Sequence, residues 1–524
     1  MSSSWLVAGL EEGPAPVQPR RWLALAVLCV SLLIVSLDTT ILNIALPDIV
    51  RQLHASETQL QWVVDVYACV FAGLLLVAGS VGDRIGRKRL FCGGLVIFGA
   101  ASAASAFSSD LTWLDLSRSL MGVGAACIMP ATLSIISDIF RDDQTRARAI
   151  GIWSGTTGLG VAIGPIAGGW LLVHYWWGSI FLINVPFSVL GILGALWLVP
   201  ESKDPQRRPI DWLGAVSSAA GLTLLVWSII NVSVNGWGAF SSWGAASIAV
   251  VILGGFIAWE RHTTFPLLVI EPFGDRRFSM AMLGGALSIF SLMSALFLLT
   301  QYLQFSLGYS PLATGVRILP IAVVLGVAAL SSSQLDKWFG TKVVITAGML
   351  IVAGGLWQLT TVTVTSGYSH ALAGMMLLGA GAGFIIAPAT SSVMAALPRE
   401  RAGVGSGINS SAQEVGGALG VAVIGTALSS RYRAEMAPLL VGHAVPLAAK
   451  NAILGSLGGA LTVAHMAGGA MGKALALAAR LAFVEGMDLA LAVGAIVLAV
   501  SAVVVAVALP ARAKKRAQPK GQGQ

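Results

Sequence analysis

The segment Val27–Pro47, VLCVSLLIVSLDTTILNIALP, is long and apolar enough to cross a lipid bilayer, yet it contains a carboxylate, Asp38, and no basic residue to pair with it. The hydrocarbon core takes about 20 apolar residues to cross as a helix, and an ionised Asp near its centre costs about 2.5–3.5 kcal/mol. One explanation is a buried, hydrogen-bonded group that fixes packing. We adopt the other as a working hypothesis, in which Asp38 faces a wet pathway and exchanges a proton or a cation.

The composition places the whole chain in a membrane. Of its 524 residues, 56% are hydrophobic and only 11% are charged, whereas a soluble domain carries about 25% charged residues. The apolar runs are longer than the roughly 10 alternating residues of a barrel strand, so we predict an all-α polytopic membrane protein. The net charge of +8 does not indicate nucleic-acid binding, because the basic residues fall in loops between spans. No disulfide framework or metal site is expected, because CxxC spacing is absent among Cys29, Cys69, Cys92 and Cys127.

About fourteen spans are expected, with basic residues concentrated in alternate connections. By the positive-inside rule these connections and both termini are cytoplasmic, in a multi-pass protein of the plasma or inner membrane. Met1–Pro19 lacks the layout of a signal peptide, so we expect the first span to stay in the mature protein. The predicted spans lie near 22–46, 58–80, 90–107, 112–139, 148–172, 178–199, 210–230, 243–259, 279–303, 312–332, 342–364, 371–396, 404–428 and 487–509.

The segment 429–486 is predicted to be a long external loop, although it contains five Lys or Arg residues. A long translocated loop escapes the positive-inside rule. Its middle part, Asn451–Gly472, is rich in Gly and Ala and weakly apolar. Two placements stay open for this part: an amphipathic or hairpin element in the interface, or a segment packed on the outer face.

The chain contains an internal repeat. Met129-Pro130-Ala131-Thr132 and Ala387-Pro388-Ala389-Thr390 each end a span before a Gly-rich span, at an offset that gives both copies the same membrane orientation. Two parallel six-span repeats with a pathway between them are a recurrent transporter design. We therefore predict an N-terminal tail, a first six-helix half, two inserted helices with linkers, a second six-helix half and a basic C-terminal tail, at 1–21, 22–200, 201–277, 278–509 and 510–524.

The connection between spans two and three has an unusual spacing, in Gly79-Ser80-Val81-Gly82-Asp83-Arg84-Ile85-Gly86-Arg87-Lys88-Arg89-Leu90. Glycine turns, a carboxylate and several guanidinium groups at a helix corner suit a charge-pair latch that forms in one conformation and breaks in another. Topology alone explains the basic residues but not the Gly-x-x-x-Asp-x-x-Gly spacing. The residues we assign to this gating loop are Gly79, Gly82, Asp83, Arg84, Gly86 and Arg87.

This connection resembles the signature loop of the major facilitator superfamily. Three further stretches agree: Arg118–Gly124 resembles the fourth-span motif of proton-coupled members, Gly160–Gly169 the fifth-span motif of antiporters, and Leu37–Pro47 the first-span motif of fourteen-span drug:proton antiporters. The resemblance implies a major facilitator fold of two six-helix halves plus two inserted helices. The counterpart of the loop in the second half, Asp336–Gly340, is one residue too long and lacks the Arg cluster.

The fifth span has glycines on one helical stripe, which lets another helix approach closely, and a proline that permits a bend. A close-packed interface alone would also account for this pattern. The resemblance implies that the stripe is the exporter's hinge and its seal against proton leak, formed by Gly160, Gly164, Pro165, Gly168 and Gly169.

Three acids lie within spans: Asp38, Asp65 and Glu414. One acid can hold a proton while the site is empty and release it when a cationic substrate binds. The neighbours Trp62 and Gln61 share a face with Asp65, and the Trp ring can add a cation–π contact. Arg118 has Asp115 three residues away as a structural partner, whereas the resemblance implies that Arg118 modulates the proton affinity of an acid. Proton coupling is therefore assigned to Asp38, Arg118, Asp65 and Glu414.

A wall of aromatic and amide groups in span nine suits a greasy substrate held without strict geometry, although a plain core stripe has the same pattern. The expected substrate site comprises Asp38, Asp65, Glu414, Trp62, Gln61, Phe297, Gln301, Gln304, Phe305 and Gln413.

The predicted function is proton-coupled multidrug efflux of lipophilic cations by alternating access. A dedicated exporter of one metabolite, antibiotic or lipid on the same fold stays open. An enzyme is not expected, because HExxH, GxxxxGKS and GxSxG motifs are absent. The expected partners are small lipophilic cations, protons and the bilayer, with no nucleic acid, no cofactor or metal beyond the proton gradient, and a monomeric state.

Overall fold

The computed structural model describes residues 18–53, 57–203, 211–235, 240–264, 266–268, 270–397, 402–441 and 445–509. Fourteen helices in this part of the chain are long and apolar enough to span a membrane, as predicted. The first half contains α1 (Gln18–Leu53), α2 (Glu57–Ile85), α3 (Arg87–Ala106), α4 (Leu111–Ile139), α5 (Asp143–His174), α6 (Ser179–Leu182) and α7 (Asn184–Leu198), of which α6 and α7 together form the sixth span. The inserted pair is α8 (Trp212–Asn235) and α9 (Phe240–Glu260).

The second half begins after the short helix η1 (Glu271–Gly274). It contains α10 (Arg276–Gln301), the π-helical turn η2 (Tyr302–Ser306), α11 (Pro311–Phe339), α12 (Thr341–Leu359), α13 (Tyr368–Ala396), α14 (Ala402–Leu439), α15 (Leu447–Gly455), α16 (Leu457–Ala467) and α17 (Gly469–Ala508). Side-chain caps start several helices; for example, Asp142 accepts a hydrogen bond from the Thr145 amide, which lowers the pKa of the Asp142 carboxyl group.

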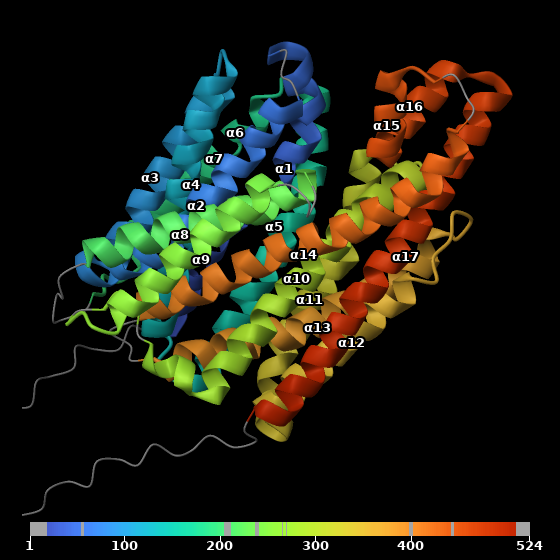
Figure 1. Ribbon diagram of the computed structural model, residues 1–524. Coiled ribbons are helices and arrows are strands. Elements are labelled where there is room, and N and C mark those ends of the chain that lie inside the picture. The colour runs from blue at the N-terminus through green and yellow to red at the C-terminus, as the bar shows by residue number, and fades with distance from the viewer. Residues whose placement is uncertain are drawn as a thin grey trace, which may run out of the picture.

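The two halves contact each other through equivalent helices. The second helix of each half packs against the fifth helix of the other, since α2 contacts α14 and α11 contacts α5. The two helices that carry the repeated proline motif, α4 and α13, are the fourth of each half, and each has its proline inside the helix. Each half also buries its own hydrophobic core. The helix contacts thus follow the internal repeat predicted from the sequence, and Figure 1 shows the helices of the two halves side by side.

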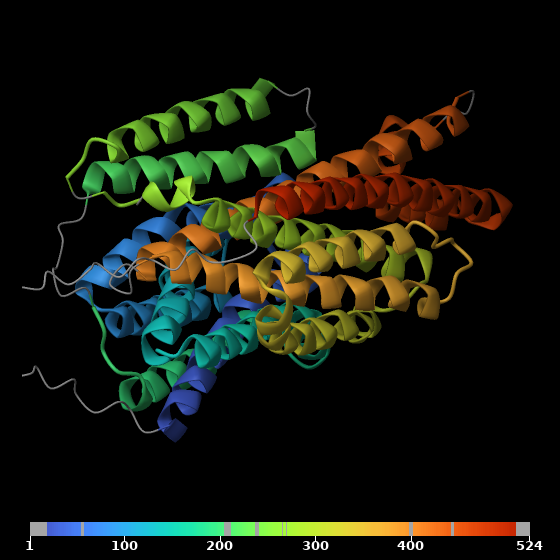
Figure 2. The same cartoon turned by 90° about the horizontal axis from the view of Figure 1, so that it is seen from below.

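The inserted pair lies on the outside of the bundle (Figure 2). Helix α8 packs against α2 and α14 of the two halves, and α9 packs against α8. A small apolar cluster of Cys69, Ala72 and Val226 joins α2 to α8.

The prediction of an external loop at 429–486 is wrong for the described residues. Helix α14 continues to Leu439, α15 and α16 form a hairpin, and α17 begins at Gly469, well before the predicted start of the last span (Figure 1). Tyr432 of α14 donates a hydrogen bond to the Ile453 carbonyl of α15 (3.0 Å). One of the basic residues here, Arg431, pairs with Glu435 and Glu485 (2.8 and 3.1 Å). The segment is thus a packed helical extension of α14 and α17.

Candidate functional site

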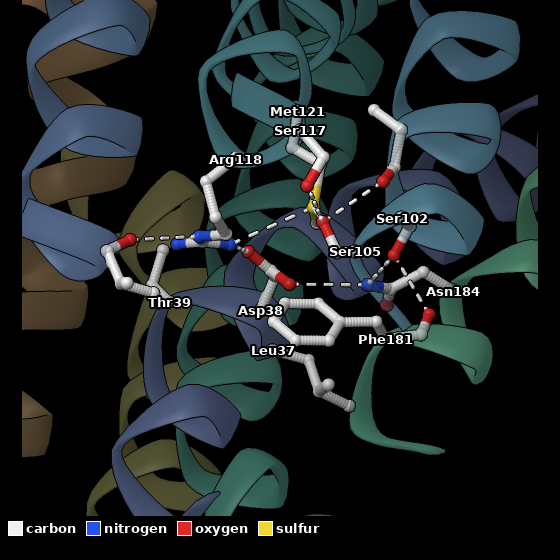
Figure 3. A network of polar contacts seen from close by, with 12 residues as sticks. Leu37, Asp38, Thr39, Ser102, Ser105, Ser117, Arg118, Met121, Phe181 and Asn184 are labelled. Atoms are coloured by element: carbon white, nitrogen blue, oxygen red, sulfur yellow. Dashed lines mark hydrogen bonds and ion pairs between the residues drawn. The ribbon is translucent and has the colours of Figure 1, made fainter. Parts of the chain in front are cut away.

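Asp38 of α1 and Arg118 of α4 form a buried ion pair (Figure 3). Arg118 Nη1 donates to Asp38 Oδ2 at 2.5 Å, and the two side chains are 2% and 0% exposed. The residue that appears uncompensated within its own segment therefore has a partner 80 positions away. Breaking a buried pair by removing one member typically costs about 3–5 kcal/mol, because the other charge is left buried without compensation.

The remaining Arg118 contacts come from α2. Its Nε donates to the Val63 carbonyl (3.2 Å), and its Cζ lies 4.4 Å from the centroid of the Tyr67 ring. Of the two interpretations left open for Arg118, the one in which Asp115 is its structural partner does not hold, because Arg118 pairs with Asp38. Among the described residues, Asp115 Oδ1 has no hydrogen-bond partner. Arg118 thus connects α4 to α1 and α2 by charge, hydrogen bond and cation–π contact.

Sequence reasoning missed Asn184, which completes the coordination of Asp38. The Asn184 amide donates to Asp38 Oδ1 (3.2 Å) and to Ser102 Oγ (3.0 Å), and Ser102 donates to the Phe181 carbonyl (2.8 Å). Asn184 is fully buried at the start of α7, directly after the short break that separates α6 from α7. A polar residue inside the sixth apolar span was the signal that could have identified it.

The depth of this network differs from the sequence expectation. Arg118 is seven residues from the start of α4, and Asn184 is five from the start of α6. At 1.5 Å per residue, both lie within about 11 Å of the end of the bundle at which these two helices begin. Asp38 therefore lies nearer to this end of the spans than to their centre. A proton on Asp38 would remove the charge attraction while leaving Arg118 its contacts with Val63 and Tyr67, so the pair can act as a switch.

The corner after α2 ties the two halves together at the opposite end. Asp83 accepts from Arg87 Nε (2.9 Å) and also from the backbone amides of Gly403 and Val404 at the start of α14 (3.0 and 3.2 Å). The carboxylate thus meets the positive end of the helix dipole. Gly79 and Gly403 lie against each other with no room for a Cβ on either. This contact between the halves is the kind that a conformational latch requires.

The other glycines of this corner have local roles. Gly86 has φ 119°, a backbone conformation that favours glycine, and Glu201 packs against it. Gly82 packs on Leu90. Arg84 is exposed at the end of α2, and the ion pair of this corner is formed by Asp83 and Arg87.

The glycine stripe of α5 packs against α1, directly beside Asp38. A methyl group on Gly160 would lie 2.8 Å from the Leu33 carbonyl oxygen, and one on Gly164 would lie 3.0 Å from the Leu37 carbonyl oxygen. The other face of α5 packs against α11, where Pro165 contacts Gly315 and Gly169 contacts Leu312. Gly168 is buried in the same helix. Helix α5 therefore links the Asp38 helix to the second half.

Gly160→Ala is expected to weaken folding by about 1–3 kcal/mol, as overpacking typically does, and to reduce transport because α1 must shift with Asp38. Gly158→Ala is the matched control on the same helix, because its methyl group would meet Leu325 at an ordinary 3.6 Å. Thermal unfolding in detergent and substrate efflux from cells measure the two effects. Equal behaviour of both variants would contradict a role for the α5–α1 contact.

The other two acids predicted to lie within spans are on α2 and α14, which pack together. Glu414 is twelve residues into α14, about 18 Å from its start, and lies within electrostatic range of Tyr67 and Cys69 on α2. Asp65 likewise interacts electrostatically with Cys69. The structure thus places Asp65 and Glu414 on facing helices. Tyr67 of α2 contacts Arg118 and is also within electrostatic range of Glu414.

Comparison with known proteins identifies the family. The family model described as Major Facilitator Superfamily matches residues 28–421. This chain belongs to the major facilitator superfamily. It is 35% identical over 492 residues to the multidrug efflux pump LfrA of Mycolicibacterium smegmatis, covering 93% of this chain and 96% of that protein.

Two further comparisons place this major facilitator protein among its relatives. The methyl viologen resistance protein SmvA of Salmonella typhimurium is 34% identical over 476 residues, covering 90% of this chain and 95% of that one. Among solved structures, an inward-facing bacterial homologue of the human lysosomal transporter Spinster aligns with a TM-score of 0.59 at 19% identity, covering 94% and 98% of the two chains. The structural likeness supports the fold.

The remaining predicted substrate residues of this major facilitator protein do not share one environment. Phe297 is 37% exposed and packs near Gly425 of α14, 3.8 Å from the position that a Cβ on this glycine would take. The Gln301 amide donates a weak hydrogen bond to the Phe297 carbonyl (3.4 Å). Gln304 and Phe305 lie in the π-helical turn, which breaks the helical spacing used to place them on one face. Phe305 packs against Gly458 of α16.

Other members of the predicted set also occupy distinct places. Trp62 is 45% exposed, and the side chain of Gln61 lies outside the described residues. Gln413 is buried against Gly285 of α10, and its Nε2 has no hydrogen-bond partner among the described residues. In the described part of the chain, no three His, Cys, Asp or Glu side chains gather as metal ligands would.

Proposed function

We propose that this protein is a proton-coupled multidrug efflux antiporter that exports lipophilic cations by alternating access. Support for efflux comes from relatives of nearly full length, one named a multidrug efflux pump and another a methyl viologen resistance protein. Methyl viologen is a dication, which favours cationic substrates. We further propose that the protein works as a monomer in the cell membrane, with the Asp83 corner and both termini on the cytoplasmic side, as the positive-inside rule predicts.

The observation that carries proton coupling is the buried Asp38–Arg118 pair. A carboxylate held by one guanidinium and one amide has few other means of compensation, so protonation and release of Arg118 go together. The pair contacts α2 through Val63 and Tyr67, and α2 also carries Asp65 and packs against the Glu414 helix. A cation bound near Asp65 and Glu414 would therefore act on the same helix that holds Arg118.

We propose the proton gradient as the energy source, in keeping with a sequence that contains no GxxxxGKS motif. One proton moving through 100 mV releases about 2.3 kcal/mol. One or two protons per cycle would sustain concentration ratios of roughly tens to a thousand, since about 1.4 kcal/mol corresponds to a factor of ten.

The decisive experiment measures proton release from purified protein in liposomes under an imposed pH gradient. Ethidium, a quaternary ammonium dye and a neutral drug are added in turn. We expect release with both cations and none with Asp38→Asn, whereas Asp110→Asn should behave as wild type, because Asp110 lies outside the spans as a helix cap and Asn also caps helices.

Two results would contradict the proposal. If the folded wild-type protein releases no protons with any of the three compounds, the polyspecific antiporter is excluded and a dedicated substrate takes its place. If Asp38→Asn still releases protons, another acid carries them.

A further inference from the structure

A cavity of about 580 Å³ lies between the inserted pair and the second half. It is an open groove bounded by α8 and α9 on one side and by α10 and α14 on the other, with side chains from α2 and the α9–α10 linker. Its walls are almost wholly apolar, and include Leu222, Phe256, Met282, Leu283, Ile408 and Ala412. Neither the Asp38 network nor the Asp83 corner contributes to it. An apolar cavity of this size binds a greasy ligand favourably.

The cavity has the depth of one bilayer leaflet. Helix α10 begins at Arg276, and the innermost cavity residue on it, Ala286, is ten residues further, or about 15 Å. This is half of the roughly 30 Å hydrocarbon core. On α9, the cavity residues Leu253 to Ile257 lie within seven residues of the last helical residue, Glu260. The cavity therefore runs from one interface to the midplane, as an acyl chain does.

Both charges that a zwitterionic headgroup requires lie within four residues, along the chain, of residues that line the cavity. Arg276 stands one turn before the cavity residue Ser279, and Arg261 follows one turn after the cavity residue Ile257. Glu271 lies in the linker between the cavity residues Leu268 and Phe273. All three charged residues are exposed. Arginines bind phosphate and a carboxylate binds an ammonium group.

We propose that the cavity holds a phospholipid with a zwitterionic, primary-ammonium headgroup of the phosphatidylethanolamine class. One acyl chain fills the space between α9, α10 and α14, with the phosphate at Arg261 and Arg276 and the ammonium at Glu271. The lipid completes the contact between the inserted pair and the second half, where the protein alone leaves a gap. The site is independent of the proposed transport activity, so its test needs no transport measurement.

The test uses purified protein in nanodiscs containing phosphatidylethanolamine with a diazirine on one acyl chain, followed by peptide mass spectrometry. We expect cross-links in 253–257, 279–286 and 408–415. Ala412→Trp fills the cavity, and Met282→Trp is a second filling variant should the first fail to fold. Displacing even two methylene groups should lower labelling about tenfold. Val251→Trp is the control, because Val251 is on α9 like the cavity residues Leu253 to Ile257, but is 73% exposed and does not line the cavity.

A second labelling experiment tests the headgroup assignment. Phosphatidylcholine and phosphatidylglycerol that carry the same diazirine should cross-link to the cavity less than phosphatidylethanolamine does. The double variant Glu271→Gln/Arg276→Gln should remove that preference. Arg141→Gln with Lys203→Gln is the control on exposed residues elsewhere. Equal labelling by all three lipids, no effect of either filling variant, or loss of label on addition of ethidium would each overturn the proposal, the last by making the cavity a substrate site.

Discussion

Arg118→Met is expected to destabilise the protein by about 3–5 kcal/mol and to abolish export, because it leaves the Asp38 carboxylate buried with the Asn184 amide as its one remaining partner among the described residues. Methionine keeps much of the side-chain length while removing the charge, the Val63 hydrogen bond and the cation–π contact with Tyr67. Thermal unfolding of the purified protein and ethidium efflux from cells measure the two losses.

The double variant Asp38→Asn/Arg118→Met separates stability from function. With both charges removed, the unfolding temperature should recover most of the loss, since replacing a buried pair is often nearly neutral. Export should stay absent, because the carboxylate that would carry the proton is missing. A double variant as unstable as Arg118→Met would show that packing rather than charge dominates. Restored export would remove Asp38 from the proton pathway.

Gly79→Val is expected to prevent closure of the bundle at the Asp83 corner. Its side chain would collide with the backbone of Gly403, which cannot move without displacing α14. The same displacement breaks the two amide hydrogen bonds to Asp83. Hydrogen bonds to a charged group contribute about 1.5–3 kcal/mol each, so losing both should shift the conformational equilibrium by at least about a hundredfold.

Distance measurements between spin labels at Arg141→Cys and Lys342→Cys, at this end of the two halves, report the shift in a protein whose native cysteines are replaced. The distribution should move to longer distances with Gly79→Val and with Asp83→Ala. Gly354→Val is the control, because a Cβ there meets nothing within 4 Å. An unchanged distribution with both corner variants would mean that the Asp83 corner does not hold the halves together.

The candidate site could be predicted in part. The cost of a charge in a membrane singled out Asp38, Arg118, Asp65 and Glu414 from the sequence, and the structure joins the first two directly. The pairing itself was inaccessible, because the sequence places Asp115 near Arg118 and Asp38 far away. Asn184 and Tyr67 escaped notice since an amide and a phenol cost less in a span than a charge, and their roles depend on which helices become neighbours.

The helical wall assigned to span nine shows a different limit. The 3.6-residue spacing that put Phe297 and Phe305 on one face fails where the π-helical turn inserts at Tyr302. Such a turn is decided by packing, here against α16 and by Arg480 of α17, whose Nε donates to the Phe305 carbonyl at 3.0 Å.

By itself, the sequence determined the number of spans, their expected orientation and the repeat of two halves, because length, hydropathy and basic loops act locally on each segment. Only the tertiary structure decided which charges meet: Asp38 with Arg118, and Asp83 with amides 320 residues away. It also decided that 447–467 is a helical hairpin. Short, weakly apolar helices depend on packing for their stability, and a contact between distant segments exists only once the helices between them have packed.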